Sequence, residues 1–198
     1  MQDPFVKTLI NNREIERIQI ESEFQQLLDI MRQEHVQSVL EIGFWKGGTA
    51  LGFDKEITGG RITSIDFWAV AEDTAAFLTG NSAFRNHFEF INGHSHRAPT
   101  IEAAEKQAPY DMLFIDGGHT YDDVKQDYVN YSGFVRKEGM IVFHDIRLET
   151  DPVTGKEGVK RAYWELAEGN FHSELIAPYP DDLPRKEGFG IGIIYKSW

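Results

Sequence analysis

The chain has 198 residues, a length that suits one domain with a single hydrophobic core. Its 20 basic and 32 acidic residues give a net charge of −12, and no basic run occurs, which argues against a nucleic-acid partner or an anionic membrane surface. Cysteine is absent, so disulfides, thiolate metal sites and cysteine nucleophiles are excluded. Because the sequence has neither a signal-peptide pattern nor an apolar run of roughly 20 residues, we expect a cytoplasmic protein with no membrane partner.

The N-terminal segment predicts a packing helix. Over residues 13–33, apolar side chains recur on one helical stripe, at Ile20, Phe24, Leu27, Leu28 and Met31. This pattern predicts an amphipathic helix that starts after Asn11-Asn12 and either packs on the flank of a sheet or forms part of a substrate lid. The sequence therefore predicts a single domain over residues 1–198, with an N-terminal helical extension over 1–35 and a Rossmann-like core over 36–198.

Beyond residue 35, short apolar runs alternate with helical segments. The runs predict strands at 36–42, 61–65, 88–92, 112–115, 139–143, 172–176 and 189–195. The segments between them predict helices at 47–58, 68–78, 100–108, 120–135 and 159–167. Five strand–helix units followed by two terminal strands predict an α/β fold: a Rossmann-like three-layer α/β/α sandwich with a mostly parallel seven-stranded sheet and an antiparallel last strand.

The turn after the first strand of the core is rich in glycine. It reads Glu41-Ile-Gly43-Phe-Trp-Lys-Gly47-Gly48-Thr49 and opens a helix. A phosphate-binding P-loop would have Lys where Thr49 stands, and a dinucleotide fingerprint would have glycine where Trp45 stands. Two interpretations remain: an acid before a glycine turn that suits a positively charged ligand, and an ordinary strand–turn–helix whose glycines serve packing.

Polar residues follow the ends of the later strands as well. Asp66 ends the second strand, 23 residues after Gly43, close to the spacing of about 20 at which α/β nucleotide folds place a ribose-binding carboxylate. Asp116 follows the fourth strand, with His119 in the same loop, and His144-Asp145 follow the fifth strand. Because the carboxyl ends of parallel strands meet at one edge of a sheet, we expect these side chains to lie close together.

Together these motifs resemble the class I S-adenosylmethionine-dependent methyltransferases, in particular the group with catechol-type and macrolide-sugar (macrocin-type) O-methyltransferases and the cephalosporin-hydroxylase-named proteins. The resemblance covers about residues 36–195. It rests on five motifs in order: Glu41-x-Gly43-x-x-x-Gly47-x-Thr49, Ser64-Ile65-Asp66, Gly93-His94-Ser95, Phe114-Ile115-Asp116-Gly117-Gly118-His119-x-Tyr121 and His144-Asp145.

The resemblance implies S-adenosyl-L-methionine as cofactor. The implied contacts are Glu41, Gly43, Phe44, Trp45, Gly47, Thr49, Asp66, Phe67, Gly93, His94, Ser95 and Asp116. The first turn would face the methionine part, Asp66 would hold the ribose, and Phe67 with His94 and Ser95 would border the adenine.

The resemblance also implies a divalent metal, Mg²⁺ or Mn²⁺, on Asp116, His144 and Asp145. His144 departs from the family pattern of oxygen ligands, because imidazole suits Zn, Mn, Fe, Co or Ni better than Mg. Asp116 and His119 are the implied catalytic residues, with His119 as the general base. Two alternatives stay open: Asp116 and Asp145 cap helices and bind cofactor without a metal, or His144 faces away from the ion.

The expected function is transfer of a methyl group to a hydroxyl of a small molecule, such as a sugar, a diol or a catechol-like compound. The N-terminal helix and loops 146–157 and 178–188 would shape the substrate, and a homodimer is possible by resemblance. Two other functions remain open: an NAD-dependent Rossmann oxidoreductase, and a non-catalytic cofactor-binding subunit with the same fold.

Overall fold

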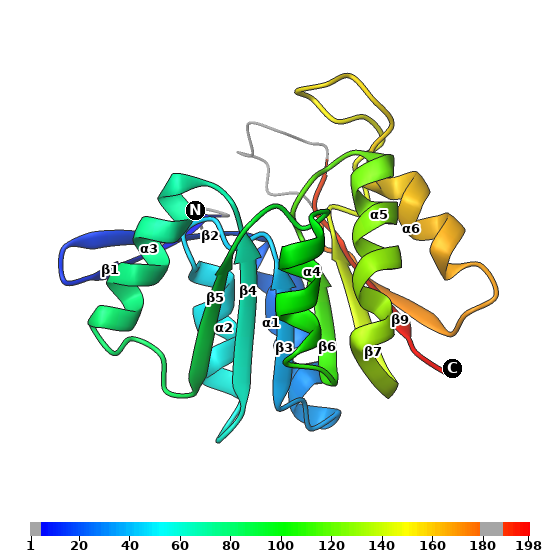
Figure 1. The fold of residues 1–198 in the computed structure, drawn as a ribbon. Coiled ribbons are helices and arrows are strands. Elements are labelled where there is room, and N and C mark those ends of the chain that lie inside the picture. Colours follow the sequence, from blue (N-terminus) through cyan, green and yellow to red (C-terminus); the bar gives the residue numbers. More distant parts are fainter. Residues whose placement is uncertain (1–4, 179–187) are drawn as a thin grey trace.

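The computed structural model describes residues 5–178 and 188–198 (Figure 1). Its centre is a seven-stranded sheet in the order β5-β4-β3-β6-β7-β9-β8. The strands are β3 (Ser38–Ile42), β4 (Arg61–Asp66), β5 (His87–Asn92), β6 (Tyr110–Ile115), β7 (Val135–His144), β8 (His172–Leu175) and β9 (Ile191–Tyr195). The first five are parallel, and β9 is antiparallel to both β7 and β8. The predicted sheet is confirmed.

Helices cover both faces of the sheet, which makes the predicted three layers (Figure 1). Those in the described ranges are α1 (Glu21–Gln33), α2 (Gly48–Glu56), α3 (Ala69–Gly80), α4 (Ala98–Glu105), α5 (Tyr121–Tyr131) and α6 (Val159–Ala167). Successive side chains of a strand point to opposite faces, so each inner strand feeds two apolar cores. Val39 packs in the core of α1, α2 and α3, and Leu40 packs in the core of α4, α5 and α6.

The N-terminal segment differs from the prediction. Residues 13–20 are not helical: β1 (Phe5–Ile10) and β2 (Arg13–Ile18) form an antiparallel hairpin, and the helix starts only at Glu21. Asn11 and Asn12 have φ of 45° and 68°, and a two-residue turn with both residues in the left-handed region matches the twist of a hairpin. The segment is thus a hairpin followed by a helix rather than a helical extension.

The region around residue 135 is a second correction. The helix expected over 120–135 ends at Tyr131, a 3-10 turn covers Ser132–Phe134, and β7 begins at Val135 rather than at 139. Gly133 lies in that turn, and glycine is a weak helix former. Val135 pairs with Tyr110, so tertiary pairing rather than local propensity sets the start of this strand.

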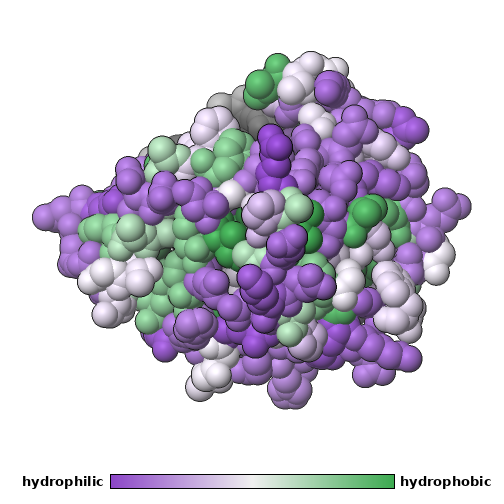
Figure 2. All heavy atoms as spheres, in the orientation of Figure 1, coloured by the Kyte–Doolittle hydropathy of each residue, from purple (hydrophilic) through white to green (hydrophobic). Residues whose placement is uncertain are grey.

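The surface in the view of Figure 2 is largely hydrophilic, with hydrophobic residues in one area on the side of α3 and in smaller separate patches elsewhere. Among the described residues, no helix is both long enough and apolar enough to cross a membrane.

The loops that leave the strands share one edge of the sheet. Gly43 N donates to Ile65 O (2.9 Å), and Asp116 N donates to Ile42 O (2.8 Å). On the other side of β4, Gly93 N donates to Asp66 O (2.9 Å). The ladder therefore continues one residue beyond the strands and holds the turns that carry the candidate residues side by side.

Candidate active site

A cavity of about 660 Å³ opens at this edge, a size typical of small-molecule sites. The residues expected from sequence that line it are Gly43, Phe44, Trp45, Thr49, Asp66, Phe67, Gly93, His94, Ser95, Asp116, His119, His144 and Asp145. Glu41 and Gly47 are not among the lining residues. The structure thus brings together nearly all of the residues named from the motifs.

The glycines of the first turn serve close packing of the chain on itself. Gly43 has φ of +95°, and a Cβ there would lie 2.0 Å from the carbonyl oxygen of Asp116. A Cβ at Gly48 would lie 2.4 Å from the carbonyl oxygen of Glu16 in the hairpin. These glycines therefore let the exit of β3 touch the exit of β6 and let the hairpin touch α2, as the packing interpretation of the turn has it.

Glu41 lies in the sheet rather than in the cavity. Its side chain is fully buried, Oε2 accepts a hydrogen bond from Ser64 Oγ (2.6 Å), and Oε1 has no partner among the described residues. Burial raises the pKa of Glu41 to about 8, so the carboxyl is neutral at neutral pH. A buried neutral acid away from the cavity lining does not supply the charge that the sequence assigned to it.

Asp66 holds two turns together. Its Oδ2 accepts N–H donors of Phe44 (3.0 Å) and Trp45 (2.9 Å), and its Oδ1 accepts those of Phe67 (2.7 Å) and Trp68 (3.0 Å). Charge-assisted bonds of this kind are stronger than neutral ones. Asp66 thus fixes the β3 turn against the β4 turn and also lines the cavity.

An aromatic surface continues from Asp66. Phe67 stacks on His94 with ring centroids 5.0 Å apart and on Trp68 with centroids 5.1 Å apart. Phe67 and Trp68 are more than half exposed and line the cavity. Such a surface suits a flat heterocycle, since stacking on an aromatic ring needs no specific hydrogen bond. Sequence reasoning placed Phe67 and His94 here but missed Trp68.

His96 is a second residue of this wall that no sequence motif indicates. Its Nε2 lies 3.2 Å from Oδ1 of Asp127, a fully buried carboxylate on α5. The contact with Asp127 raises the pKa of His96. Nearby, Tyr131 Oη donates to the carbonyl oxygen of Ser95 (2.6 Å). Helix α5 therefore anchors the loop after β5.

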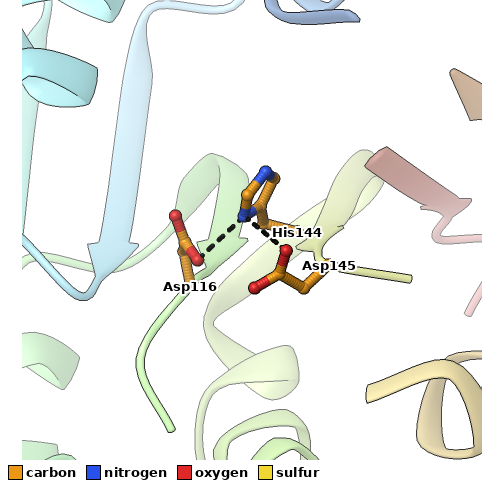
Figure 3. A group of neighbouring side chains, drawn as sticks. All are labelled: Asp116, His144 and Asp145. Atoms are coloured by element: carbon orange, nitrogen blue, oxygen red, sulfur yellow. Dashed lines mark hydrogen bonds and ion pairs between the residues drawn. The ribbon is translucent and has the colours of Figure 1, made fainter. Parts of the chain in front are cut away.

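Asp116, His144 and Asp145 converge at the other end of the cavity (Figure 3). One donor atom from each lies within 4.8 Å of the others. His144 Nδ1 is 3.1 Å from Asp116 Oδ1 and 3.6 Å from Asp145 Oδ1. His119 Nε2 lies beside them, 3.3 Å from Asp145 Oδ2 and 3.8 Å from Asp116 Oδ1.

The charged groups of this cluster shift one another's pKa values in the direction opposite to the effect of burial. Burial by itself lowers the pKa of His144, but the two carboxylates outweigh it and raise the pKa to about 9. Burial likewise favours the neutral form of Asp116, yet His144 and His119 hold the pKa of that carboxyl well below its usual range. The pKa of His119 is raised against its burial by Asp116 and Asp145. Asp116 is therefore ionised and faces a cationic partner in His144.

Gln19 is the residue of this site that sequence reasoning missed most completely. Its Nε2 donates to Asp116 Oδ2 (2.9 Å), and its Oε1 accepts from the hydroxyl of Thr49 (3.1 Å). Gln19 comes just after β2, in the stretch that the sequence predicted as helix. The only local signal was Asn11-Asn12, which fits a hairpin turn as well as a helix start.

The donor set fits a divalent metal. It offers two carboxylate oxygens and one imidazole nitrogen within reach of one another, and two of the three side chains are buried. Hydrogen bonds to Gln19 and to Phe189 N, which donates to Asp145 Oδ1 (2.6 Å), orient the two acids. Three ligands from the protein leave coordination positions for oxygens of a substrate or of water.

The loop expected to shape the substrate does reach the cavity. Asp151, Val153 and Thr154 line it, and the segment folds back through an isolated bridge between Thr150 and Glu157. Val153 is 89% exposed, so its methyl groups are available to a bound molecule. Most of loop 178–188 lies outside the described residues.

Comparison with known proteins bears on the family. A family model described as a methyltransferase domain matches residues 40–146, more than half of the chain. No curated protein matches. The family match decides against the NAD-dependent oxidoreductase.

Solved structures agree in fold. The O-methyltransferase from Bacillus cereus in complex with SAH is 17% identical over 89% of this chain and 81% of that chain, with a TM-score of 0.69. The O-methyltransferase TomG from Streptomyces achromogenes in complex with SAM is 19% identical over 89% of this chain and 80% of that chain, with a TM-score of 0.65. The fold, the order of the motifs and the family match lead to one conclusion: the chain belongs to the methyltransferase domain family, with the class I S-adenosylmethionine-dependent architecture.

Proposed function

We propose that the protein is an O-methyltransferase that acts on a hydroxyl of a small molecule with the help of a divalent metal. The observation that carries this proposal is the convergence of Asp116, His144, Asp145 and His119 at one end of a cavity whose other end has an aromatic wall. Two acids that could hold an ion, with a histidine 3.3 Å from one of them, suit activation of a hydroxyl. The similar structures from Bacillus cereus and Streptomyces achromogenes are O-methyltransferases, which supports the same choice of acceptor atom.

The cofactor end is assigned from the cavity lining. Phe67, Trp68 and His94 would stack the adenine, Asp66 would lie at the ribose, and the turn at Gly43 with Thr49 would lie along the methionine part. S-adenosylmethionine supplies a methyl group on a sulfonium. Glu41 and Gly47 have only an indirect role here, since neither lines the cavity.

The acceptor end is where this chain's own residues act. Asp116, His144 and Asp145 would hold a divalent ion that lowers the pKa of the acceptor hydroxyl. His119 Nε2, at the margin of the cluster, would take the proton of that hydroxyl. Gln19 would keep Asp116 oriented, and loop 146–157 with Val153 would exclude water. The acceptor class that suits two neighbouring oxygens on one ion is a vicinal diol, a sugar or a catechol.

The proposal also covers the organisation of the chain. Residues 1–198 would act as one domain, because the hairpin and α1 contribute Arg17, Gln19 and core side chains to the same cavity and sheet. A homodimer stays a proposal by resemblance, and size-exclusion chromatography with light scattering tests it.

The experiment that tests the function has two parts. Calorimetry should detect binding of S-adenosylhomocysteine and none of NADH, and a panel of diols, catechols and sugars with Mg²⁺ or Mn²⁺ should yield a methyl ether by mass spectrometry. His119→Asn should lower kcat by roughly 10²- to 10⁴-fold, the usual contribution of a general base, and leave the Kd for S-adenosylhomocysteine unchanged.

The matched control is His172→Asn on β8, which removes an imidazole away from the cavity and should leave kcat unchanged. A kcat that is the same in the His119 variant as in the native chain would refute the assigned base. Cofactor binding without transfer to any acceptor in the panel would favour the non-catalytic subunit.

A further inference from the structure

We propose that the metal site prefers a first-row transition ion, such as Mn²⁺ or Co²⁺, over Mg²⁺, because His144 supplies a nitrogen ligand to it. This inference rests on the metal-assisted function proposed above and goes beyond it by naming the kind of ion. The resemblance on its own implied Mg²⁺ as readily as Mn²⁺.

The His144 ring has a fixed direction. His144 ends β7 and is only 4% exposed, so neighbouring atoms fix its ring. Nδ1 points between the carboxylates of Asp116 and Asp145, 3.1 Å from an oxygen of the first and 3.6 Å from an oxygen of the second (Figure 3). The alternative in which His144 faces away from the ion does not describe this arrangement.

Hydrogen bonds hold the carboxylates of Asp116 and Asp145 so that each presents an oxygen to the cluster. Gln19 engages Asp116 Oδ2, while Asp116 Oδ1 faces His144. Phe189 N engages Asp145 Oδ1, the oxygen 3.6 Å from His144 Nδ1, while Asp145 Oδ2 lies 3.3 Å from His119 Nε2. Asp145 itself has φ of +59°, a strained conformation for a non-glycine residue that is often found at functional sites.

The other nitrogen of the His144 ring is Nε2. His144 Nε2 is buried and has no hydrogen-bond partner in the described part of the chain. A histidine that binds metal through one nitrogen carries its proton on the other, usually toward a carboxylate. Apart from the two cluster acids, Glu23 is the carboxylate that acts electrostatically on this ring. Glu23 is fully buried on α1, where its oxygens accept N–H donors of Ala177 (2.8 Å) and Gly190 (3.0 Å). Burial raises the pKa of Glu23, so the assignment of Nδ1 to the ion rests on its position between Asp116 and Asp145 rather than on a charge beside Nε2.

The chemistry of the ligand set distinguishes Mg²⁺ from the transition ions. Mg²⁺ binds through carboxylates, phosphates and water in near-ideal octahedral geometry. Imidazole binds Mn²⁺, Fe²⁺, Co²⁺, Ni²⁺ and Zn²⁺ better than it binds Mg²⁺. The affinity of a given site rises from Mn²⁺ through Fe²⁺ and Co²⁺ to Ni²⁺. The site therefore has two of the ligands that Mg²⁺ prefers and one that it does not.

The test measures metal binding directly. Protein freed of metal by a chelator and dialysed is titrated with MgCl₂, MnCl₂ or CoCl₂ by calorimetry, without cofactor or acceptor. We expect Mn²⁺ and Co²⁺ to bind at least about tenfold more tightly than Mg²⁺. His144→Asp, which restores an all-oxygen set, should shrink that ratio by about tenfold or more, whereas His172→Asp makes the same change of side chain away from the cluster and should leave the ratio unchanged.

A spectroscopic measurement on the native chain guards against misfolding of the variant. Pulsed electron paramagnetic resonance of the Mn²⁺-loaded protein should show coupling to an imidazole nitrogen. Equal affinity for Mg²⁺ and Mn²⁺, or Mn²⁺ bound without nitrogen coupling, would overturn the inference while leaving metal-assisted transfer intact. If none of the three ions bound at millimolar concentration, the metal part of the proposed function would fall, and this inference with it.

Discussion

The buried carboxyl of Glu41 makes the stability of the protein depend on pH in a way that one substitution removes. Glu41→Gln keeps the size of the side chain and a polar group for Ser64 Oγ, but it cannot ionise. In the native chain, burial raises the pKa of Glu41 from 4.5 to about 8, and the acids Asp116 and Asp66 add to the rise. The unfolded chain has no such burial, so its Glu41 ionises near the ordinary value.

The sign and size of this effect of pH on the free energy of unfolding follow from proton linkage. Because the folded-state pKa is the higher one, stability from this group is fully present below about pH 4.5 and is lost as pH rises toward about 8. A pKa difference of one unit corresponds to about 1.4 kcal/mol, so Glu41 costs the native chain roughly 2 kcal/mol at pH 6 and at most roughly 4 kcal/mol at pH 8. Glu41→Gln should therefore gain stability relative to the native chain as pH rises.

Urea unfolding followed by fluorescence of the four tryptophans, at pH 5, 6, 7 and 8, measures this difference. The control is Glu102→Gln, which removes the same charge from an exposed position on α4 and should shift the free energy of unfolding by less than about 0.5 kcal/mol at every pH. A difference between native chain and Glu41→Gln that stayed constant from pH 5 to 8 would show that Glu41 is ionised in the folded protein, and the reasoning would fail.

Three further substitutions test other parts of the site. Asp66→Ala removes the acceptor of four backbone N–H groups, so we expect weaker binding of S-adenosylhomocysteine in calorimetry and a loss of about 1–3 kcal/mol in urea unfolding. Asp127→Asn should lower the pKa of His96, which a proton NMR titration of the histidine rings measures; an unchanged pKa would show that the ion pair is not formed. Gly43→Ala places a Cβ 2.0 Å from the Asp116 carbonyl oxygen at a φ of +95°, and we expect a loss of more than about 3 kcal/mol in thermal unfolding, whereas Gly59→Ala, with open space around it, should lose less.

The parts of the fold that the sequence predicts well are those where periodicity and burial agree. Met112–Ile115 is apolar at every position because both faces of β6 are covered, and that reads directly as a central strand. Asp116, His144 and Asp145 could be placed together because right-handed crossovers bring strand ends to one edge. Their proximity in the folded chain follows from the topology of the sheet, not from their separation in the sequence.

The parts that were mispredicted are those where one pattern fits two structures. Ile20 continues the apolar stripe of α1 backward, so residues 13–20 looked helical, although Ile15 is buried on one face of a strand. Glu41 is a different case. An acid before a glycine turn suits a cation, but only the structure reveals that its side chain points into the sheet. Gln19 and His96 carry no motif at all, since their roles depend on what the fold places opposite them.

The corrected hairpin changes how the two ends of the site are connected. A strand end, unlike a helix starting at residue 13, places Gln19 where its amide can reach both Thr49 on α2 and Asp116 after β6. The amide has one donor side and one acceptor side, and both are used: the oxygen accepts from the Thr49 hydroxyl, and the nitrogen donates to Asp116. A shift of the first turn on cofactor binding would therefore act on the orientation of Asp116 through a single side chain. The N-terminal segment thus forms part of the cavity wall, and residues 13–20, expected as the start of a helix over 13–33 that packs on the sheet or forms a lid, contribute a strand and Gln19 to that wall instead.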